Sequence, residues 1–531
     1  MGADVWTALL LAALLPLLLV LSWHLVWRPR AIARSFARQG IRGAHYRFLA
    51  GSLPEAKRLV AAGRRGVAPL DAGNHDIVPV VLPQFHSWAV KHGRTFLYWM
   101  RPIPAICSTD LELIKEVLTD KTGLFLKDYM SPALKVLLGN GMVLLNGDEW
   151  KQHRKVVLPA FNHEKLKSML VVTAQLTEQM IQAWRNQMQE SNGQLAAEIN
   201  MSNAAFGDLT EEIIGHVGFG SNQSDREASK VIVAAMHEMQ KISTAATADL
   251  PIFWYLPSRH RLRMRRLDNL LRTKITAMMQ ARVAAKDAKC GSGYGDDLFG
   301  MLMEAWSPEE KGSGHGNTLT SQEVIDEWKT FFAAGQETTA TLLSWSMFLL
   351  SVHPEWQEKV REEVLREWGR HGDSEVPSIG VLTSKLKLLH MVILETSRLY
   401  PSFVYIQQRA ARDVVIRGIS VPRGTVVSVP IVMLHRDKEV WGSDADEFNP
   451  ARFENGIAKD AKDPKALLSF SLGPRACIGQ SFGVMEAQMV MALILRNFSF
   501  SLSPKYVHKP KFLISLTPKL GMSLIVRNQD G

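Results

Sequence analysis

Residues 470–479 read FSLGPRACIG, a composition unlike that of a regular helix or strand. Two glycines and a proline predict tight turns, and Arg475 places a positive charge two residues before Cys477. Cys477 is one of only three cysteines in 531 residues, which indicates a reducing compartment and no disulfide framework. The sequence therefore presents one thiol in a stiff, basic loop.

Four interpretations of Cys477 are open. A small buried side chain is the simplest, and it is the interpretation that we adopt for Cys107 and Cys290. A nucleophilic cysteine needs a partner base that no local motif supplies, and zinc needs a Cys/His cluster that the sequence lacks. A thiolate ligand to haem iron explains the loop, because glycines let backbone N–H groups approach the sulfur and Arg475 can neutralise a haem propionate.

The pattern upstream of this loop predicts a mainly helical chain. Its longest segment is Ser321–Val352, where Thr320 and Glu323 form a capping-box pattern and His353-Pro354 ends the helix. A glycine-rich run at 310–317 predicts a surface loop before this helix. Other helical patterns lie at 166–190, 228–244, 261–286 and 356–368, and β-rich runs lie at 413–433 and 512–518.

The middle of the long helix is inconsistent with its surroundings. AAGQETTA (333–340) places a glycine and the polar Glu337, Thr338 and Thr339 in an otherwise apolar segment, and a glycine there costs about 1 kcal/mol against alanine. Such an inconsistency is typical of a functional site. A solvent-facing stripe or a helix kink would give the same pattern.

Taken together, these features resemble the cytochrome P450 family. Its haem-binding loop, FxxGxRxCxG, is matched by Phe470, Gly473, Arg475, Cys477 and Gly479. AGQETT (334–339) is similar to the oxygen-activating motif of the family, with Glu337 where many members carry aspartate. The other landmarks that match are WKQHR (150–154), the ETSR pair Glu395 and Arg398, Arg409, and FNPARF (448–453) with Arg452.

The resemblance implies a mainly α fold with a smaller β region, and haem b as the cofactor. It implies that Cys477 ligates the iron as a thiolate, and that amides after Cys477 hydrogen-bond the sulfur. Glu337 and Thr338 would deliver protons to bound oxygen, and Gly335 would keep the helix backbone clear of it. The residues implied to hold the haem are Trp150, Arg154, Arg409, Arg475, Phe470 and Gly479, whereas Glu395, Arg398 and Arg452 are implied to be structural.

The acid and hydroxyl of the long helix also indicate the reaction class. Family members that rearrange hydroperoxides tend to lose this pair, so we expect a monooxygenase that takes electrons from NADPH through NADPH-cytochrome P450 reductase. A fatty-acid hydroperoxide-rearranging enzyme, a non-catalytic haem-binding protein and a membrane-anchored thiol hydrolase are the alternatives. The formal charge of +10 favours an acidic partner, but no nucleic-acid recognition motif accompanies it.

The start of the chain predicts a membrane anchor. The run from Val5 to Trp27 is apolar over 23 residues, which as a helix spans about 34 Å, against about 30 Å for a bilayer core. Arginines follow it, so the positive-inside rule places the body in the cytosol. A cleaved signal peptide would carry its basic flank before the run. We therefore expect an anchor at 1–27 in the endoplasmic reticulum membrane, a basic linker at 28–60 and the catalytic domain at 61–531.

The substrate is indicated only as a class. We expect the cavity walls at 129–143, at Phe332 and Ala333, and at 516–518, and these are mostly apolar. Phe403 and Tyr405 replace small residues of the family, so they either narrow the pocket or pack the core. Gln39-Gly40-Ile41 and RTFLYW (94–99) resemble a plant clan that contains fatty-acid hydroxylases and gibberellin-, brassinosteroid- and cytokinin-oxidising enzymes, and the fatty-acid branch looks most similar.

Overall fold

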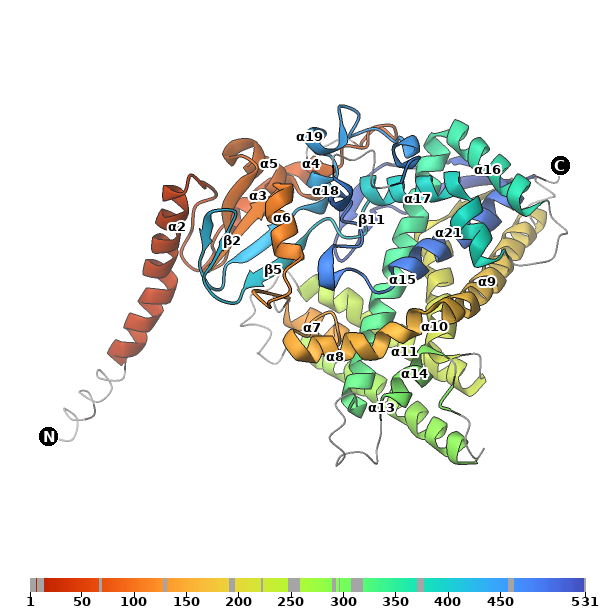
Figure 1. Cartoon of the computed structure of the whole chain (residues 1–531), viewed down its shortest axis with the longest axis horizontal. Helices are drawn as coiled ribbons and strands as arrows, with labels where there is room; N and C mark the ends of the chain where they lie inside the picture. Colours follow the sequence, from red (N-terminus) through yellow and green to blue (C-terminus); the bar gives the residue numbers. More distant parts are fainter. Residues whose placement is uncertain are drawn as a thin grey trace.

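The computed structural model describes residues 6, 14–65, 69–127, 131–190, 196–220, 223–246, 258–288, 293–295, 297–306, 319–369, 377–456 and 463–529. Long helices form the larger part, and a five-stranded sheet lies at the end of the molecule from which helix α2 projects (Figure 1). The mainly α fold with a smaller β region is therefore confirmed. The expected loop at 310–317 lies outside the described residues.

The long helices begin and end close to where the apolar spacing predicts. Helix α15 (Ser321–Val352) is α-helical throughout, and both bonds of the Thr320–Glu323 capping box are present. The other helices are α2 (Arg28–Arg38), α3 (Leu53–Arg65), α4 (Val78–Val81), α5 (Pro83–His92), α6 (Leu111–Leu118), α7 (Pro132–Leu138), α8 (Gly147–Val157), α9 (His163–Glu190), α10 (Asp208–Phe219), α11 (Gln223–Ala246), α13 (Arg259–Ala288), α14 (Leu298–Glu304), α16 (Pro354–Trp368), α17 (Lys387–Leu399), α18 (Ile431–Leu434), α19 (Lys438–Trp441) and α21 (Gln480–Asn497).

The strands form one larger sheet, one small sheet and two hairpins. The order of the larger sheet is β1 (Thr95–Met100), β2 (Ile103–Ser108), β8 (Val426–Val429), β5 (Ile406–Ala410) and β3 (Phe125–Leu126), with only the β2–β8 pair parallel. The small sheet joins β4 (Ala196–Asn200), β12 (Ser523–Asn528) and β9 (Phe498–Leu502), and the hairpins are β6 (Val414–Ile416) with β7 (Ile419–Val421) and β10 (Pro510–Phe512) with β11 (Leu516–Pro518). The run at 413–433 is not all strand, because Pro430 has no N–H to continue the ladder and the chain turns into α18.

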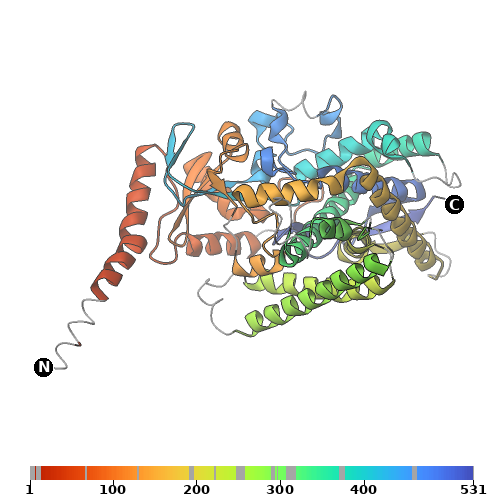
Figure 2. The same ribbon diagram turned by 60° about the horizontal axis from the view of Figure 1, so that its bottom comes forward.

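Helix α15 crosses the centre of the molecule and contributes its first half to one apolar core and its second half to another. It contacts α10 and α7 on one side, and α17 and α21 on the other. Helices α11 and α13 form a pair that covers its first half, as Figure 2 shows at the bottom of the molecule. Because neighbours surround α15, its second half is buried on nearly all faces, which explains an apolar run with little amphipathic character.

The N-terminal segment enters the body through α2. Its buried side chains, Ile32 and Phe36, pack with strand residues such as Leu97 and Trp99 in one apolar cluster. Within the described residues, no helix is both long and apolar enough to cross a bilayer. The expected span from Val5 to Trp27 falls partly outside those residues, so membrane anchoring stays a prediction.

Buried histidines make the stability of this fold sensitive to acid. Burial lowers the pKa of His75 and of His435 to about 3, and that of His508 to about 4. The ring of His435 bridges two elements, because Nδ1 donates to the carbonyl oxygen of Arg398 at 2.9 Å and Nε2 accepts from the N–H of Leu468 at 2.9 Å. Protonation would break this bridge.

We therefore expect the melting temperature to fall as the pH drops from about 6.5 towards 4. The unfolded chain binds protons on these histidines from about pH 6.5 downward and the folded chain does not, so folding loses stability across that window. Each such histidine contributes a slope of up to about 1.4 kcal/mol per pH unit. The His435→Gln variant should give a shallower slope in melting curves between pH 7 and 5, and an unchanged slope would contradict the assignment.

Candidate functional site

The loop that carries Cys477 is a short turn in front of helix α21. The N–H of Cys477 donates to the carbonyl oxygen of Phe470 at 2.9 Å and closes the loop. Gly473 has φ +72°, and a Cβ there would lie 2.4 Å from the carbonyl oxygen of Leu118, so the turn requires glycine. The backbone N–H of Gly479 hydrogen-bonds the sulfur of Cys477. The loop thus presents the thiol in the way that the sequence predicts.

The thiol of Cys477 opens onto a large cavity inside the protein. Burial raises the pKa of this thiol, whereas the N–H of Gly479 and the positive charges of Arg154 and Lys127 lower it. The N–H and the two cations favour the thiolate form of Cys477, which burial disfavours. A cation bound in front of the sulfur would stabilise the thiolate further. Cys107, in contrast, is fully buried in β2, as expected for a small core side chain.

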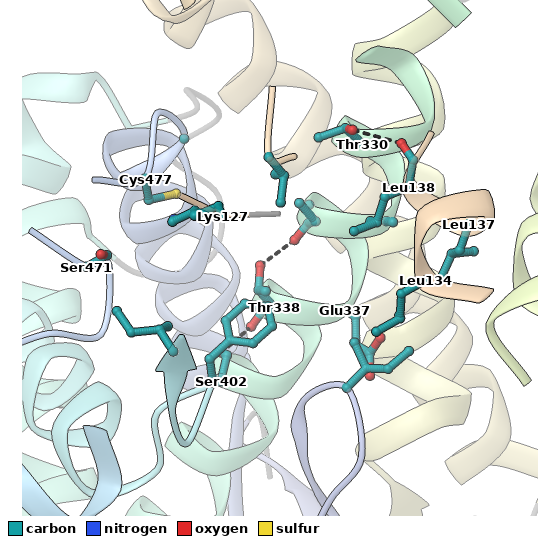
Figure 3. A pocket seen from close by; sticks show the side chains of 18 of the residues that line it. Lys127, Leu134, Leu137, Leu138, Thr330, Glu337, Thr338, Ser402, Ser471 and Cys477 are labelled. Atoms are coloured by element: carbon teal, nitrogen blue, oxygen red, sulfur yellow. Dashed lines mark hydrogen bonds between the residues drawn. The ribbon is translucent and has the colours of Figure 1, made fainter. Parts of the chain in front are cut away.

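The cavity has a volume of about 1350 Å³ and lies between α15, α7, the Cys477 loop and the end of β5. Figure 3 shows Cys477 and Lys127 at one wall, and Thr338 and Glu337 on α15 across from them. Leu134, Leu137 and Leu138 of α7 contribute apolar surface. The cavity therefore brings together the two sequence motifs that the resemblance places at one site.

Three cations meet at one edge of the cavity. The guanidinium of Arg475 lies 4.3 Å over the ring of Trp150, and that of Arg154 lies 5.6 Å from the same ring. Arg475 donates to the carbonyl oxygens of Leu145 at 2.6 Å and Met142 at 3.3 Å. Arg154 donates to the carbonyl oxygen of Ala476 at 3.2 Å. The expected residues Trp150, Arg154 and Arg475 are thus together.

The third cation, Lys127, was missed by the sequence prediction. Burial and the charge of Arg475 lower the pKa of Lys127 to about 8, and burial with the charge of Arg154 lowers that of Arg475 to about 10. Within the described residues, none of Lys127, Arg154 and Arg475 forms an ion pair with a carboxylate. A bound anion would relieve this repulsion, which fits the propionates of a haem.

Arg409 is not among the residues that line the cavity. Arg409 lies on β5, where it pairs with Val426 of β8 on one side and with Leu126 of β3 on the other. Leu126 immediately precedes Lys127 in the chain. Gln407, two residues earlier on the same face of the strand, does line the cavity. A propionate contact from Arg409 therefore stays a prediction.

Glu337 and Thr338 both line the cavity; the Thr338 side chain is held within α15, and that of Glu337 is held by neighbouring segments. Thr338 Oγ1 donates to the carbonyl oxygen of Ala334 at 2.6 Å. Ser515 Oγ donates to one carboxylate oxygen of Glu337 at 2.6 Å, and Gln240 Nε2 donates to the other. Burial raises the pKa of Glu337, and the bonds from Ser515 oppose that shift. A carboxyl with a raised pKa beside a hydroxyl is suited to proton transfer.

Gly335 lines the cavity and also permits a close helix contact. A Cβ at this position would lie 2.9 Å from Cδ1 of Ile214, on α10. A larger residue at Gly335 would therefore require the end of the Ile214 side chain to move. Helix–helix proximity of this kind is not visible in a single sequence.

Glu395, Arg398 and Arg452 form a buried ionic network away from the cavity. Arg398 donates to both carboxylate oxygens of Glu395, at 2.7 and 2.8 Å, and neither side chain is exposed. Arg398 also donates to the carbonyl oxygens of His435 and Ala445 at 2.6 Å. Arg452 lies 3.8 Å from Glu395. The network joins α17 to the segment that follows α18, which supports a structural role.

Two buried acids near the site were not predicted. Glu327 on α15 accepts from His153 of α8 at 2.6 Å and from the N–H of Met142 at 2.7 Å, so it fixes α8, which carries Trp150 and Arg154. Glu486 on α21 accepts from Thr339 at 3.3 Å, and burial raises its pKa to about 8. Both contacts join segments that are more than 140 residues apart, so sequence spacing gives no signal for them.

The expected cavity walls need two corrections. Phe332 is buried against Trp328, and Phe331 lines the cavity in its place, whereas Ala333 lines the cavity as expected. Residues 516–518 form strand β11, with Leu516 fully buried, and the hairpin directs residues 512–514 towards the cavity. The segment 131–143 lines the cavity in part, and Tyr129 lies outside the described residues.

Phe403 and Tyr405 both line the cavity. Phe403 is 39% exposed, so it narrows the pocket instead of filling the core. Tyr405 does both, because its ring also packs 5.7 Å from Phe85 and 5.5 Å from Phe512. Phe403 thus fits only the first of the two interpretations that the sequence left open, and Tyr405 fits both.

Comparison with known proteins agrees with this geometry. Residues 81–525 match the profile of the family described as cytochrome P450. Cytochrome P450 709B3 of Arabidopsis thaliana is 36% identical over 95% of this chain and 94% of its own length. Cytochrome P450 734A6 of rice (Oryza sativa subsp. japonica) is 37% identical over 94% and 92%, and the 11-oxo-beta-amyrin 30-oxidase of Glycyrrhiza uralensis is 34% identical over 98% of each chain. The chain therefore belongs to the cytochrome P450 family and is a haem-thiolate monooxygenase related to plant enzymes.

Proposed function

We propose that the protein inserts one atom of O2 into a C–H bond of a small apolar molecule, using electrons that NADPH supplies through a flavoprotein reductase. The observation that carries this proposal is the placement of Cys477 across one cavity from Glu337 and Thr338. A haem-binding sensor would need the thiol but has no need of the acid and the hydroxyl. A thiol hydrolase would need a base beside Cys477, whereas its charged neighbours are the cations Arg154 and Lys127.

In this proposal, haem bound in the cavity supplies the activation of dioxygen. Cys477 is the thiolate ligand, and the N–H of Gly479 moderates the basicity of the sulfur. Arg154, Arg475 and Lys127 neutralise the propionates, with Trp150 stacked beneath the guanidinium of Arg475. The carbonyl oxygen of Phe470 accepts a hydrogen bond from the N–H of Cys477 and so closes the loop.

Glu337 and Thr338 are proposed to move protons towards the reacting oxygen. Because burial raises its pKa, Glu337 takes up a proton more readily than an exposed carboxyl does, and it can pass that proton on. The hydroxyl of Thr338 donates to the carbonyl oxygen of Ala334, so its oxygen can accept a hydrogen bond from a group in the cavity. When the hydroxyl rotates, it can instead donate its proton to that group. Hydrogen bonds from Ser515 and Gln240, on two segments outside α15, hold the carboxylate of Glu337 in place.

The Thr338→Ala variant is expected to keep its haem but to lower the product formed per NADPH by about tenfold or more. Loss of the hydroxyl interrupts proton delivery, while electrons still arrive. The measurement is NADPH consumption against product and hydrogen peroxide. Thr338→Ser should restore coupling. Ser344→Ala is the matched control. Ser344 also lies on α15 and donates to the carbonyl oxygen four residues earlier, that of Ala340, at 2.7 Å, but it does not line the cavity. A fully coupled Thr338→Ala enzyme would remove the proposed role.

The substrate is proposed to be an apolar terpenoid or hormone-type molecule. The cavity walls are mostly apolar, and Phe331, Phe403 and Tyr405 contribute aromatic surface. One relative is named for oxidising 11-oxo-β-amyrin, which supports a terpenoid more than the fatty acid that the sequence impression favoured.

The cellular arrangement is proposed from the sequence. Residues 5–27 would anchor the chain in the endoplasmic reticulum membrane, 28–60 would lead into the body, and 61–531 would form the catalytic domain in the cytosol. This arrangement would expose the protein to the microsomal reductase.

The test of the proposed function is incubation of purified protein with reductase, NADPH and labelled dioxygen, over a panel of terpenoids, hormone precursors and fatty acids. Product that carries one labelled oxygen is expected, and unlabelled product would contradict the proposal.

A further inference from the structure

A glutamine stands in the cavity wall on a strand of the larger sheet. Gln407 lies on β5 at a position that pairs with β8, whereas β3 pairs only with the later residues Arg409 and Ala410. The residue directly opposite Gln407 on β8 is Ser428. Gln407 lines the cavity, where the neighbouring Met100, Ile103 and Ile406 are apolar and Arg101 is charged. A polar side chain hydrogen-bonded within a mostly apolar stretch of wall needs an explanation.

The amide of Gln407 is oriented with Nε2 towards two buried hydroxyls and towards the sulfur of Met100, which can only accept. Its Nε2 donates to the hydroxyl of Tyr98 at 3.0 Å and to that of Ser428 at 3.0 Å. These two hydroxyls also bond each other at 2.7 Å, and Tyr98 is only 5% exposed. Both N–H hydrogens of the amide therefore have partners behind the cavity wall.

The amide oxygen of Gln407, Oε1, is placed to accept a hydrogen bond from a ligand. Among the described residues, no hydrogen bond is made to Oε1 of Gln407, and this atom is not buried by protein. Because the amide is planar and Nε2 points to Tyr98 and Ser428, Oε1 is the polar atom on the cavity side. An acceptor in an apolar wall is costly unless a donor meets it.

We infer that Gln407 recognises a hydroxyl group of the substrate. This inference rests on the monooxygenase function proposed above, and it narrows the substrate to a neutral alcohol with an apolar body. A hydroxyl suits the site because it can donate to Oε1, and because an uncharged group is desolvated at far lower cost than a charged one. A free carboxylate would meet the negative end of the amide dipole, and a hydrocarbon would leave Oε1 without a partner. Gln407 is thus a specificity-determining residue at a fixed point of the cavity.

The expected effect is a preference for alcohols over the matching hydrocarbons. A hydrogen bond that satisfies an otherwise unpaired acceptor corresponds to about tenfold in the dissociation constant. The probes are matched pairs that differ in one hydroxyl: β-amyrin and its 3-deoxy form, cholesterol and cholestene, and 1-dodecanol and dodecane. Binding to the purified holoenzyme is followed by the spin-state shift of the haem absorption, which does not depend on turnover.

Two variants separate recognition from a loss of packing. Gln407→Met removes the amide at nearly the same volume, and the Tyr98–Ser428 bond remains to satisfy those hydroxyls. Gln408→Met is the matched control, since Gln408 is the next residue on β5, faces the other side of the sheet and does not line the cavity. The alcohol preference should be about tenfold in the wild type and in Gln408→Met, and should disappear in Gln407→Met.

Two results would overturn this inference. One is an alcohol preference that survives in Gln407→Met, or that is absent from the wild type for pairs that bind. The other is the lack of a spin-state shift with every pair, which would exclude neutral alcohols as the ligand class. Both leave the monooxygenase proposal intact as long as the reduced carbon-monoxide spectrum shows a thiolate ligand, so the two failures are distinguishable.

Discussion

Replacing Arg398 with alanine is expected to lower the free energy of unfolding by about 3–5 kcal/mol. Glu395 and Arg398 are fully buried, and the variant would leave the carboxylate of Glu395 without its bidentate partner. The carbonyl oxygens of His435 and Ala445 would lose a donor as well. Because folded proteins are typically stable by about 5–15 kcal/mol, much of the margin would be lost. Urea unfolding of the variant, beside the wild type, measures the effect.

Two controls make this prediction specific. The Lys151→Ala variant removes an exposed ion pair with Asp148 and should change stability by less than about 1 kcal/mol. The double variant Glu395→Leu, Arg398→Met replaces the buried pair by apolar side chains and should be more stable than Arg398→Ala, because no charge is left unpaired. An Arg398→Ala protein within about 1 kcal/mol of the wild type would show that the network is not structural.

The Cys477→Ser variant should lose more than about a hundredfold in turnover, beyond the 10–100-fold that is typical when a residue only supports a metal ligand. Its fold should persist, because Cys477 opens onto the cavity instead of packing in a core. NADPH-dependent product formation and the melting temperature are the two readouts.

Cys107→Ser is the matched control for this prediction. Cys107 is fully buried in β2, where a new hydroxyl would cost about 1–3 kcal/mol without a partner. We expect Cys107→Ser to lose stability but to retain turnover below its melting temperature, which is the opposite pattern. Equal turnover in Cys477→Ser and the wild type would remove the thiol from the chemistry.

The features that the sequence predicts correctly depend on short-range chemistry. The cap of α15 is formed by Thr320 and Glu323 within one turn, and the thiol loop is closed within eight residues, so both are encoded locally. The Glu395–Arg398 pair is likewise three residues apart on one helix. Local patterns of this kind, together with the order of the family motifs, suffice for the fold and for the positions of most residues around the cavity.

The features that the sequence does not predict depend on contacts between distant segments. The charge of Lys127, directly after β3, acts on the thiol of Cys477, and Ser515 reaches Glu337 from a hairpin 178 residues away. The face of α15 that lines the cavity was misjudged at Phe332 because the helix is surrounded by neighbours and has no single apolar stripe. The role of Gln407 depends on two hydroxyls from other strands.

The most direct test of the haem-thiolate site is the absorption spectrum of the purified, reduced protein under carbon monoxide. It requires neither a substrate nor a reductase, and it reports the ligand opposite the bound gas. We predict the red-shifted Soret band that is characteristic of thiolate-ligated haem, and we predict its absence in Cys477→Ser. A wild-type protein that binds haem without this band, or that binds no haem, would contradict the assignment of Cys477.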